Sequence, residues 1–469
     1  MTVCFKGCDE AMLRAARAVA ERLIAAGHEA LFAGGCVRDA CLGRPFKDID
    51  IATSATPEQV EALFAGHTVA VGKAFGVVLV LRDGYTFDVA TFRTDGEYAD
   101  GRHPADVRFA TPEGDAARRD FTVNGLFCEP SGGAVRDYVG GLPDLAARVI
   151  RAIGEPSARF REDHLRMLRA VRFASVLGFT LDPATQAAVT AHAAWIARVS
   201  AERIASEMTR LLCESPHPSV GLHLLRVTGL LREVLPEVEA LHGTEQPPRY
   251  HPEGDVWTHT CLMLDDVPAS RDPVLAWSLL LHDIGKPATF CREDDAAGGG
   301  QKIRFPCHAP VGAAMAEAIL TRLRQPTALV EQVKAVVAGH MQGVEAKKMR
   351  SSTLRRFMGS PAFPVLLEVM RADIQHSNRQ FAPWLFLKET FEAFRAEPVL
   401  PPPLVRGRDL VAWGIAPGPR MGTLLRELYD AQLEGRLTTP EEAQAYVVNL
   451  ADMPSHAPLA LSQTMRPQK

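Results

Sequence analysis

Two aspartates, Asp48 and Asp50, are separated by a single apolar residue, Ile49, and this pattern restricts the fold of the chain most strongly. On a β-strand, residues two apart point to the same face, so both carboxylates would lie together. Paired hard oxygen ligands suit Mg²⁺ bound together with substrate phosphates. The segment therefore predicts a strand that carries a magnesium site.

A glycine pair and an arginine precede these aspartates. Gly34 and Gly35 allow backbone N–H groups to approach an anion closely, and Arg38 can bind phosphate oxygens through two hydrogen bonds. Taken alone, an Asp-x-Asp pair is common by chance, and a Gly-Gly pair is usually only a turn. Their combination within 17 residues predicts a site for phosphoryl or nucleotidyl transfer.

Length and composition set the broad class. At 469 residues the chain is expected to form about three domains. No apolar run approaches the roughly 20 residues of a membrane span, and the start lacks a signal-peptide core. Nine scattered cysteines predict free thiols in a reducing cytoplasm. With a net charge of −4, RNA would have to bind a local basic face, and neither DNA nor a membrane is an expected partner.

The pattern of apolar residues changes along the chain. The first 140 residues read as mixed α/β, with a strand at 30–33 and a hairpin at 77–90 that turns at Asp83 and Gly84. A helix is expected at 9–27, another at 37–42, and a third with Thr56 as N-cap and Pro57 at its first position. From residue 162 onward nearly everything reads as helical, apart from breaks at 242–254, 291–306 and 398–403. The predicted class is α+β.

Asp88 lies on the second strand of the predicted hairpin. It could add a third catalytic carboxylate near the metal. An ordinary exposed strand residue fits the pattern equally well.

Residues 118–126 combine Arg118, Arg119, Asp120 and Asn124 with apolar neighbours. Arginines of this kind suit contacts to ribose and triphosphate. A helix N-terminus with solvated charges is the alternative, and it fits Arg118 better than the whole set.

Residues 161–169 read as a helix on which Asp163 and Arg166 are neighbours three residues apart. A carboxylate beside a guanidinium offers acceptors and donors that can read the edge of a base. From this segment alone, an ordinary surface ion pair is favoured. Arg172 rotates onto the apolar side and is expected to have a buried partner.

Four motifs together resemble those of the class II tRNA nucleotidyltransferase/poly(A) polymerase family. They occupy residues 34–39, 48–50, 118–125 and 162–166, in the family's order and rough spacing. The resemblance implies a nucleotidyltransferase-fold head followed by all-α domains. The expected division is a catalytic head at 1–140, a neck and body at 141–245, an HD-type domain at 246–395 and a tRNA-binding tail at 396–469.

The resemblance also implies roles for individual residues. Asp48 and Asp50 match the family's Mg²⁺ ligands, and Asp163 with Arg166 matches the pair that selects CTP and ATP without a template. The full set of nucleotide-binding residues expected here is Gly34, Gly35, Arg38, Asp39, Arg119, Asp120, Asn124, Asp163, Arg166 and Arg169.

The implied activity is template-independent addition or repair of the 3′-terminal CCA of tRNA from CTP and ATP. Residues 93–104 look like the flexible loop of CCA-adding enzymes, which argues against an enzyme that adds only CC. An A-adding enzyme remains open. A poly(A) polymerase also remains open, although the end at 462–469 is short and barely basic. A non-catalytic tRNA-binding protein is disfavoured because both metal constellations are complete.

A second constellation consists of His259, His282, Asp283 and Asp373, all on predicted helices. Mixed nitrogen and oxygen ligands suit a divalent transition metal such as Ni²⁺, Mn²⁺ or Co²⁺. Residues 255–375 resemble the HD phosphohydrolase superfamily, which implies hydrolysis of phosphomonoesters or 2′,3′-cyclic phosphates; a structural remnant is the alternative.

Two further histidines, His308 and His340, fall where a two-metal HD site would place ligands. Ordinary core or surface histidines are equally consistent with the pattern. Farther along, residues 405–419 look like the tail of bacterial CCA-adding enzymes. The densest basic patch is formed by Lys347, Lys348, Arg350, Arg355 and Arg356, which could contact the tRNA backbone or form a solvated helix face.

Overall fold

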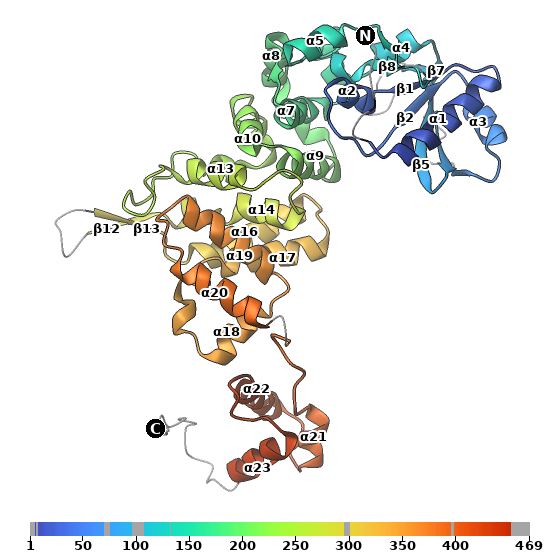
Figure 1. Cartoon of the computed structure of the whole chain (residues 1–469). Coiled ribbons are helices and arrows are strands. Elements are labelled where there is room, and N and C mark those ends of the chain that lie inside the picture. The colour runs from blue at the N-terminus through green and yellow to red at the C-terminus, as the bar shows by residue number, and fades with distance from the viewer. Residues whose placement is uncertain are drawn as a thin grey trace. The chain divides into compact units, whose positions relative to one another are not determined.

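The structure is a computed structural model that describes residues 5, 8–69, 76–95, 107–131, 133–294, 301–394 and 398–451. The chain divides into two compact units, Met1–Val337 and Ala338–Lys469. Figure 1 shows the helices and strands of the whole chain. Every described cysteine is a free thiol, as the sequence predicts. None of the helices in the described ranges combines the length and apolarity that crossing a membrane requires.

A seven-stranded sheet forms the centre of the N-terminal part. Its strand order is β3-β4-β5-β2-β1-β8-β9. The strands are β1 (Ala30–Ala33), β2 (Asp50–Thr53), β3 (Thr68–Val69), β4 (Val77–Arg82), β5 (Tyr85–Thr91), β8 (Leu126–Cys128) and β9 (Val135–Asp137). Only β2 and β5 run parallel; the other neighbouring pairs are antiparallel. A separate antiparallel pair joins β6 (Arg93–Asp95) to β7 (Val107–Phe109).

Short helices accompany this sheet (Figure 1). They are α1 (Glu10–Ala25), α2 (Gly35–Cys41), α3 (Pro57–Leu63), α4 (Pro112–Ala117) and the 3₁₀ turn η2 (Thr122–Asn124). Thr56 caps α3 through a reciprocal capping box with Gln59, and Pro57 occupies the first turn. Asp83 and Gly84 both have positive φ, which is the backbone that a two-residue hairpin turn requires. These predicted elements of the head are therefore confirmed, but the strand expected to carry both Asp48 and Asp50 begins only at Asp50.

The rest of the first unit is almost entirely helical, which confirms the α+β class. Its helices are α5 (Gly141–Ala147), α6 (Pro156–Glu162), α7 (Arg166–Leu177), α8 (Pro183–His192), η3 (Ala193–Arg198), α9 (Ala201–Glu214), α10 (Pro218–Val227), α11 (Leu230–Val234), α12 (Pro236–Glu239), α13 (Val256–Asp266), α14 (Pro273–Leu281), α15 (Lys286–Thr289), α16 (His308–Arg322) and α17 (Thr327–Gly339). Two-residue strands β10 (Val149–Ile150) and β11 (Thr180–Leu181) pair in parallel.

Two local predictions are wrong. The segment 161–169 is not one helix, because α6 ends at Glu162 and Asp163 adopts an extended backbone before α7 begins at Arg166. The segment 291–306 is not only a loop. It contains an antiparallel hairpin of β12 (Cys291–Asp294) and β13 (Gln301–Arg304), whose cross-strand pairs are mostly polar and carry little of the apolar alternation that marks a strand.

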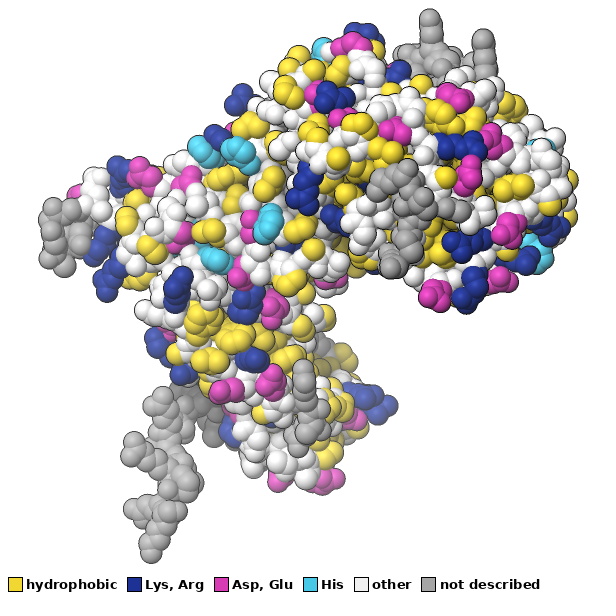
Figure 2. Space-filling view, turned by 45° about the horizontal axis from the view of Figure 1, so that its top comes forward, with side chains coloured by type: hydrophobic (Ala, Val, Ile, Leu, Met, Phe, Trp, Pro, Cys, Tyr) yellow, Lys and Arg dark blue, Asp and Glu magenta, His cyan; other side chains and the backbone are white. Residues whose placement is uncertain are grey.

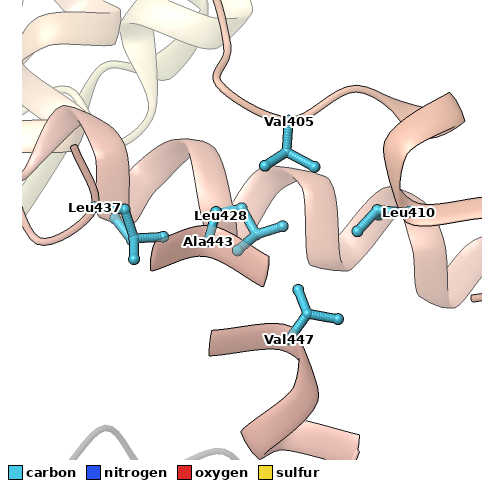
Figure 3. Close-up of a cluster of buried hydrophobic side chains, with 7 residues drawn as sticks. Val405, Leu410, Leu428, Leu437, Ala443 and Val447 are labelled. Atoms are coloured by element: carbon cyan, nitrogen blue, oxygen red, sulfur yellow. The ribbon is translucent and has the colours of Figure 1, made fainter. Parts of the chain in front are cut away.

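The second unit contains η4 (Gln342–Lys348), α18 (Ser351–Met358), α19 (Phe363–Gln375), α20 (Ala382–Ala393), α21 (Gly407–Ala412), α22 (Pro419–Leu433) and α23 (Pro440–Ala451). Its last three helices enclose a small apolar core in which Val405, Leu410, Leu428 and Val447 point toward one another (Figure 3). The tail thus has a core of its own. The four-part domain division stays a prediction.

The basic patch of the second unit is partly neutralised. Arg356 pairs with Asp430 at 2.8 Å, and Lys348 pairs with Glu345 at 2.5 Å. On the face drawn in Figure 2, the described Lys and Arg side chains are interspersed with acidic ones. This distribution agrees with the net charge of −4.

Candidate active site

Three carboxylates lie at the adjacent ends of two neighbouring strands. Asp50 is the first residue of β2, and Asp88 lies on β5. These strands are parallel and pair Ile51 with Val89, so Asp50 and Asp88 each stand one residue before a matched pair. Asp48 precedes β2 in an irregular segment rather than lying on the strand. The register therefore brings Asp88 to the predicted Asp48–Asp50 site.

The three carboxylates interact electrostatically. Although the Asp50 side chain keeps solvent-accessible surface, desolvation by the atoms packed around it and the charges of Asp48 and Asp88 raise its pKa to about 6, and Arg119 opposes this rise. Desolvation and the charge of Asp48 also raise the pKa of Asp88. The raised pKa values show that neighbouring negative charges are unfavourable here. A divalent cation with oxygen ligands would offset this repulsion.

Gly34 forms the turn between β1 and α2. Its φ is +74° and its N–H donates to the Leu126 carbonyl at 2.9 Å. A Cβ atom built on Gly34 would lie 2.7 Å from Nη1 of Arg119, so only glycine permits this approach. The buried carboxylate of Asp115 accepts hydrogen bonds from Arg119, whose Nη1 also donates to the Asn124 carbonyl at 3.2 Å.

Replacing Gly34 by alanine should lower stability and weaken nucleotide binding. The positive φ costs an L-residue about 1–2 kcal/mol, and the new methyl group displaces Arg119. Gly27 is the matched control, because its φ is +86° and its added Cβ meets open space. We expect both variants to melt earlier, while only Gly34→Ala raises KM for a nucleotide bound at the predicted site. Equal KM values in the two variants would contradict the role given to the Gly34–Arg119 contact.

A buried chain of polar side chains continues from the glycine turn. Arg38 donates from Nη1 to Asn124 at 2.6 Å and from Nε and Nη2 to Asp39 at 2.9 and 2.7 Å. Asn124 donates to Asp120 at 3.0 Å, and Arg169 donates to Asp120 at 2.8 Å. Burial disfavours the charged form of Asp120, but the Arg169 charge and hydrogen bonds from Asn124 and Arg169 hold its pKa well below the usual range.

This network of polar side chains ends at a carboxylate that the sequence analysis did not single out. Glu207 on α9 pairs with Arg172 at 2.5 Å and lies 3.8 Å from Arg169, and both Arg172 and Glu207 are buried. The predicted buried partner of Arg172 is therefore Glu207, separated from it by 35 residues. The network joins the glycine turn, η2, α7 and α9, so the nucleotide-binding candidates of three motifs share one rigid support.

Asp163 and Arg166 bind different partners, so the predicted ion pair between them is wrong. Arg203 donates to Asp163 at 2.7 Å. Arg166 is only 8% exposed; it donates to Glu162 at 2.7 Å and to the Arg118 carbonyl at 3.0 Å. Each side chain is therefore fixed separately on the two sides of the break between α6 and α7.

Three residues of the second constellation meet inside the first unit. His259 on α13, His282 at the end of α14 and the adjacent Asp283 are buried, and each offers a potential ligand atom within 4.8 Å of the others. Lys286 contacts Asp283 at 2.6 Å and donates to Gln246 at 2.7 Å. This N₂O group fits a divalent transition metal.

The other candidate ligands, which are His308, His340 and Asp373, are distributed over both units. His308 lies in the first unit, with Nε2 3.6 Å from Asp283. His340 and Asp373 belong to the second unit, the latter on α19, so their part in the constellation stays a prediction. Most of the predicted loop at 93–104 lies outside the described residues.

Comparison with known proteins identifies two segments. A model for the poly(A) polymerase head domain matches residues 30–151, and one described as "Probable RNA and SrmB- binding site of polymerase A" matches residues 178–241. The Bacillus stearothermophilus CCA-adding enzyme, solved in complex with CTP, superposes with a TM-score of 0.72 at 28% identity, covering 94% of this chain and 98% of that one.

Curated relatives differ in how far they match. Two CCA-adding enzymes at 48% and 49% identity are matched over 50% and 48% of their length, so the chain spans about half the length of these relatives. An A-adding tRNA nucleotidyltransferase of Deinococcus radiodurans is 36% identical over 72% of this chain and 80% of its own. A CCA-adding enzyme of Levilactobacillus brevis is 33% identical over 93% of this chain and 97% of its own. Since this last match extends over nearly the full length of both proteins, the chain belongs to the class II tRNA nucleotidyltransferase family of CCA-adding enzymes.

Proposed function

We propose that this protein is a template-independent nucleotidyltransferase that adds or repairs the 3′-terminal CCA of tRNA from CTP and ATP. The observation that carries the proposal is the carboxylate cluster of Asp48, Asp50 and Asp88 next to a glycine turn braced by Arg119. The names of the relatives support the same activity. The test is incorporation of labelled CTP and ATP into a tRNA transcript that lacks its CCA end.

In the proposed mechanism, the 3′-hydroxyl of the tRNA attacks the α-phosphate of the nucleotide in line. A new P–O bond forms, the bond to the β-phosphate breaks, and pyrophosphate leaves. Asp48 and Asp50 would hold Mg²⁺, and Asp88 adds negative charge beside them. Mg²⁺, when bound, supplies a Lewis acid that polarises the α-phosphate and lowers the pKa of the attacking hydroxyl.

The other residues would bind and orient the nucleotide. The Gly34 N–H is engaged with the Leu126 carbonyl, so the first turn of α2, which begins at Gly35, would present backbone N–H groups to the triphosphate. Arg38 is already engaged with Asp39 and Asn124, so it would brace this turn as well as lend positive charge. Asp163 and Arg166 would contact the Watson–Crick edge of the base in place of a template.

The pH dependence should follow Asp50. Its pKa is raised to about 6, so the ionised form that binds a cation is present above pH 6 and is lost as the pH falls below it. At subsaturating Mg²⁺ we expect kcat/KM to fall about tenfold per pH unit below 6. Asp88→Asn removes a neighbouring negative charge, so it should move this fall to lower pH. A flat profile from pH 7.5 to 5, measured at fixed ionic strength, would contradict the assignment.

Two narrower activities compete with full CCA addition. The relative from Deinococcus radiodurans supports an A-adding enzyme, which would extend only transcripts that already end in CC. A poly(A) polymerase would produce long A tracts on any RNA end. The distribution of products on defined tRNA ends distinguishes all three.

The buried group of His259, His282 and Asp283 favours a second activity, metal-dependent hydrolysis of phosphomonoesters or 2′,3′-cyclic phosphates at RNA ends. Ni²⁺, Mn²⁺ or Co²⁺ would suit these ligands. The test is phosphate release from 2′,3′-cyclic nucleotides with each metal. His282→Ala should abolish the release and leave nucleotide addition intact; hydrolysis that survives in this variant would rule out the site.

The placement of partners is also a proposal. The head at 1–140 would carry the chemistry, and the helical parts at 141–245 and 396–469 would contact tRNA, in line with the RNA-binding model that matches 178–241. The HD-type part would occupy 246–395. A cytoplasmic location fits the free thiols of the described chain.

A further inference from the structure

A glutamate in the segment before α13 links two histidines that sequence analysis did not connect. Glu253 has a side chain that is only 9% exposed. Its Oε1 atom lies 2.8 Å from Nδ1 of His251 and 2.8 Å from Nδ1 of His259. His259 itself is fully buried. One carboxylate oxygen therefore orients both imidazole rings.

These contacts determine which ring nitrogen carries the proton. A glutamate carboxylate in contact with two imidazole N–H groups is ionised at neutral pH and can only accept hydrogen bonds. Nδ1 of His259 must therefore donate. In the neutral imidazole this leaves the lone pair on Nε2.

Two neighbouring histidines are held in the same tautomer. Nδ1 of His282 lies 2.9 Å from the Leu279 carbonyl, and Nδ1 of His308 lies 3.0 Å from the Phe305 carbonyl. A carbonyl can only accept, so both rings also present Nε2. These Nε2 atoms lie 3.1 and 3.6 Å from the Asp283 carboxylate. Three histidines from separate segments thus share one tautomer next to one carboxylate.

We propose that Glu253 is a positioning residue that holds His259 in the tautomer and orientation needed to ligate a divalent transition metal together with His282 and Asp283. His251 contacts the same oxygen and helps to hold Glu253 in place. A carboxylate that receives the second ring proton of a metal-ligating histidine orients the ring and makes it a stronger ligand. The inference rests on the metal site of the second candidate activity.

The test is titration of the metal-stripped full-length protein with Co²⁺, followed by visible d–d absorption and by metal content after gel filtration. Glu253→Gln keeps the shape of the side chain but loses its charge and one acceptor oxygen. We expect it to weaken Co²⁺ binding about 10- to 100-fold and to change the absorption band. Glu253→Asp should recover part of the affinity.

Two further variants serve as controls for the Co²⁺ titration. Glu245→Gln is the matched control, because Glu245 lies in the same segment but is exposed and pairs with Arg292; it should bind Co²⁺ as the wild type does. His282→Ala removes a proposed ligand and should lose binding. Nucleotide addition by the head and the melting temperature report whether each variant is folded. If Glu253→Gln melts early, the affinity of folded Glu253→Asp decides: weakened binding supports the proposal and unchanged binding overturns it.

The outcomes separate the two levels of the proposal. Unchanged affinity and absorption in Glu253→Gln, with binding lost in His282→Ala, would overturn the role of Glu253 and leave the metal site intact. A wild-type protein that binds no Co²⁺ would overturn both. Binding that survives in His282→Ala but is lost in Glu253→Gln would place the metal on His251, Glu253 and His259 instead, and would equally overturn the positioning role.

Discussion

Replacing Asp50 by asparagine is expected to reduce nucleotide addition by about 10²- to 10³-fold or more while the protein stays folded. Asparagine keeps the shape of the side chain but removes the charge that would hold Mg²⁺. Besides desolvation, the charges of Asp48 and Asp88 raise the pKa of Asp50, so removing the Asp50 charge relieves repulsion. The melting temperature should therefore be unchanged or slightly higher. Single-turnover addition of CTP to a tRNA transcript measures the loss.

The matched control is Asp83→Asn, an exposed aspartate in the turn of the β4–β5 hairpin. Asparagine tolerates the positive φ found there, so neither fold nor rate should change. A wild-type rate in Asp50→Asn would mean that the cation is held elsewhere, and the carboxylate cluster would lose its catalytic role.

Replacing Arg166 by alanine is expected to reduce discrimination between CTP or ATP and the other two nucleotides by about 10- to 100-fold. Its guanidinium is held by Glu162 and by the Arg118 carbonyl, which is next to Arg119. A guanidinium fixed in this way is preorganised to read a base without reordering. The measurement is kcat/KM for each of the four nucleotides on a transcript that ends in CC.

Arg161→Ala separates recognition from support. Arg161 lies on α6 near Arg166 in the sequence, but it is exposed and its guanidinium lies over the ring of Trp195. Selectivity should be unchanged in this variant. If Arg166→Ala lowers the rate for all four nucleotides equally, Arg166 is a structural link between α6 and the segment after α4, and base recognition belongs to other residues.

Features encoded by short stretches of sequence could be predicted. The start of α3 needs only Thr56 as N-cap and Pro57 in the first turn, and the β4–β5 turn needs only Asp83 and Gly84. Strong local signals of this kind leave the backbone few alternatives. The same reasoning failed at Asp163, where helical periodicity suggested one continuous helix. The Asp163 carboxylate accepts a hydrogen bond from the Leu165 N–H, which ends the helix locally. It accepts another from Arg203, which lies 40 residues away in the sequence.

The candidate site shows a similar division. Asp50 and Gly34 could be singled out because their chemistry is readable from neighbouring residues. Glu207 could not, since its partner Arg172 lies 35 residues away in the sequence. Asp115 and Glu253 have partners nearby in the sequence, but nothing in the sequence shows that their carboxylates have little exposure to solvent. Burial made the difference, because a buried carboxylate must be paired, and burial cannot be read from an isolated charge.

The most direct test of the central proposal uses three tRNA transcripts, ending at the discriminator base, at C and at CC. Each is offered labelled CTP and ATP with Mg²⁺, and the products are resolved on a sequencing gel. The account predicts that all three grow to a single CCA end and then stop. Extension of only the CC-ending transcript by one A, or a long A ladder on all three, would contradict it and assign the protein to the A-adding enzymes or the poly(A) polymerases respectively.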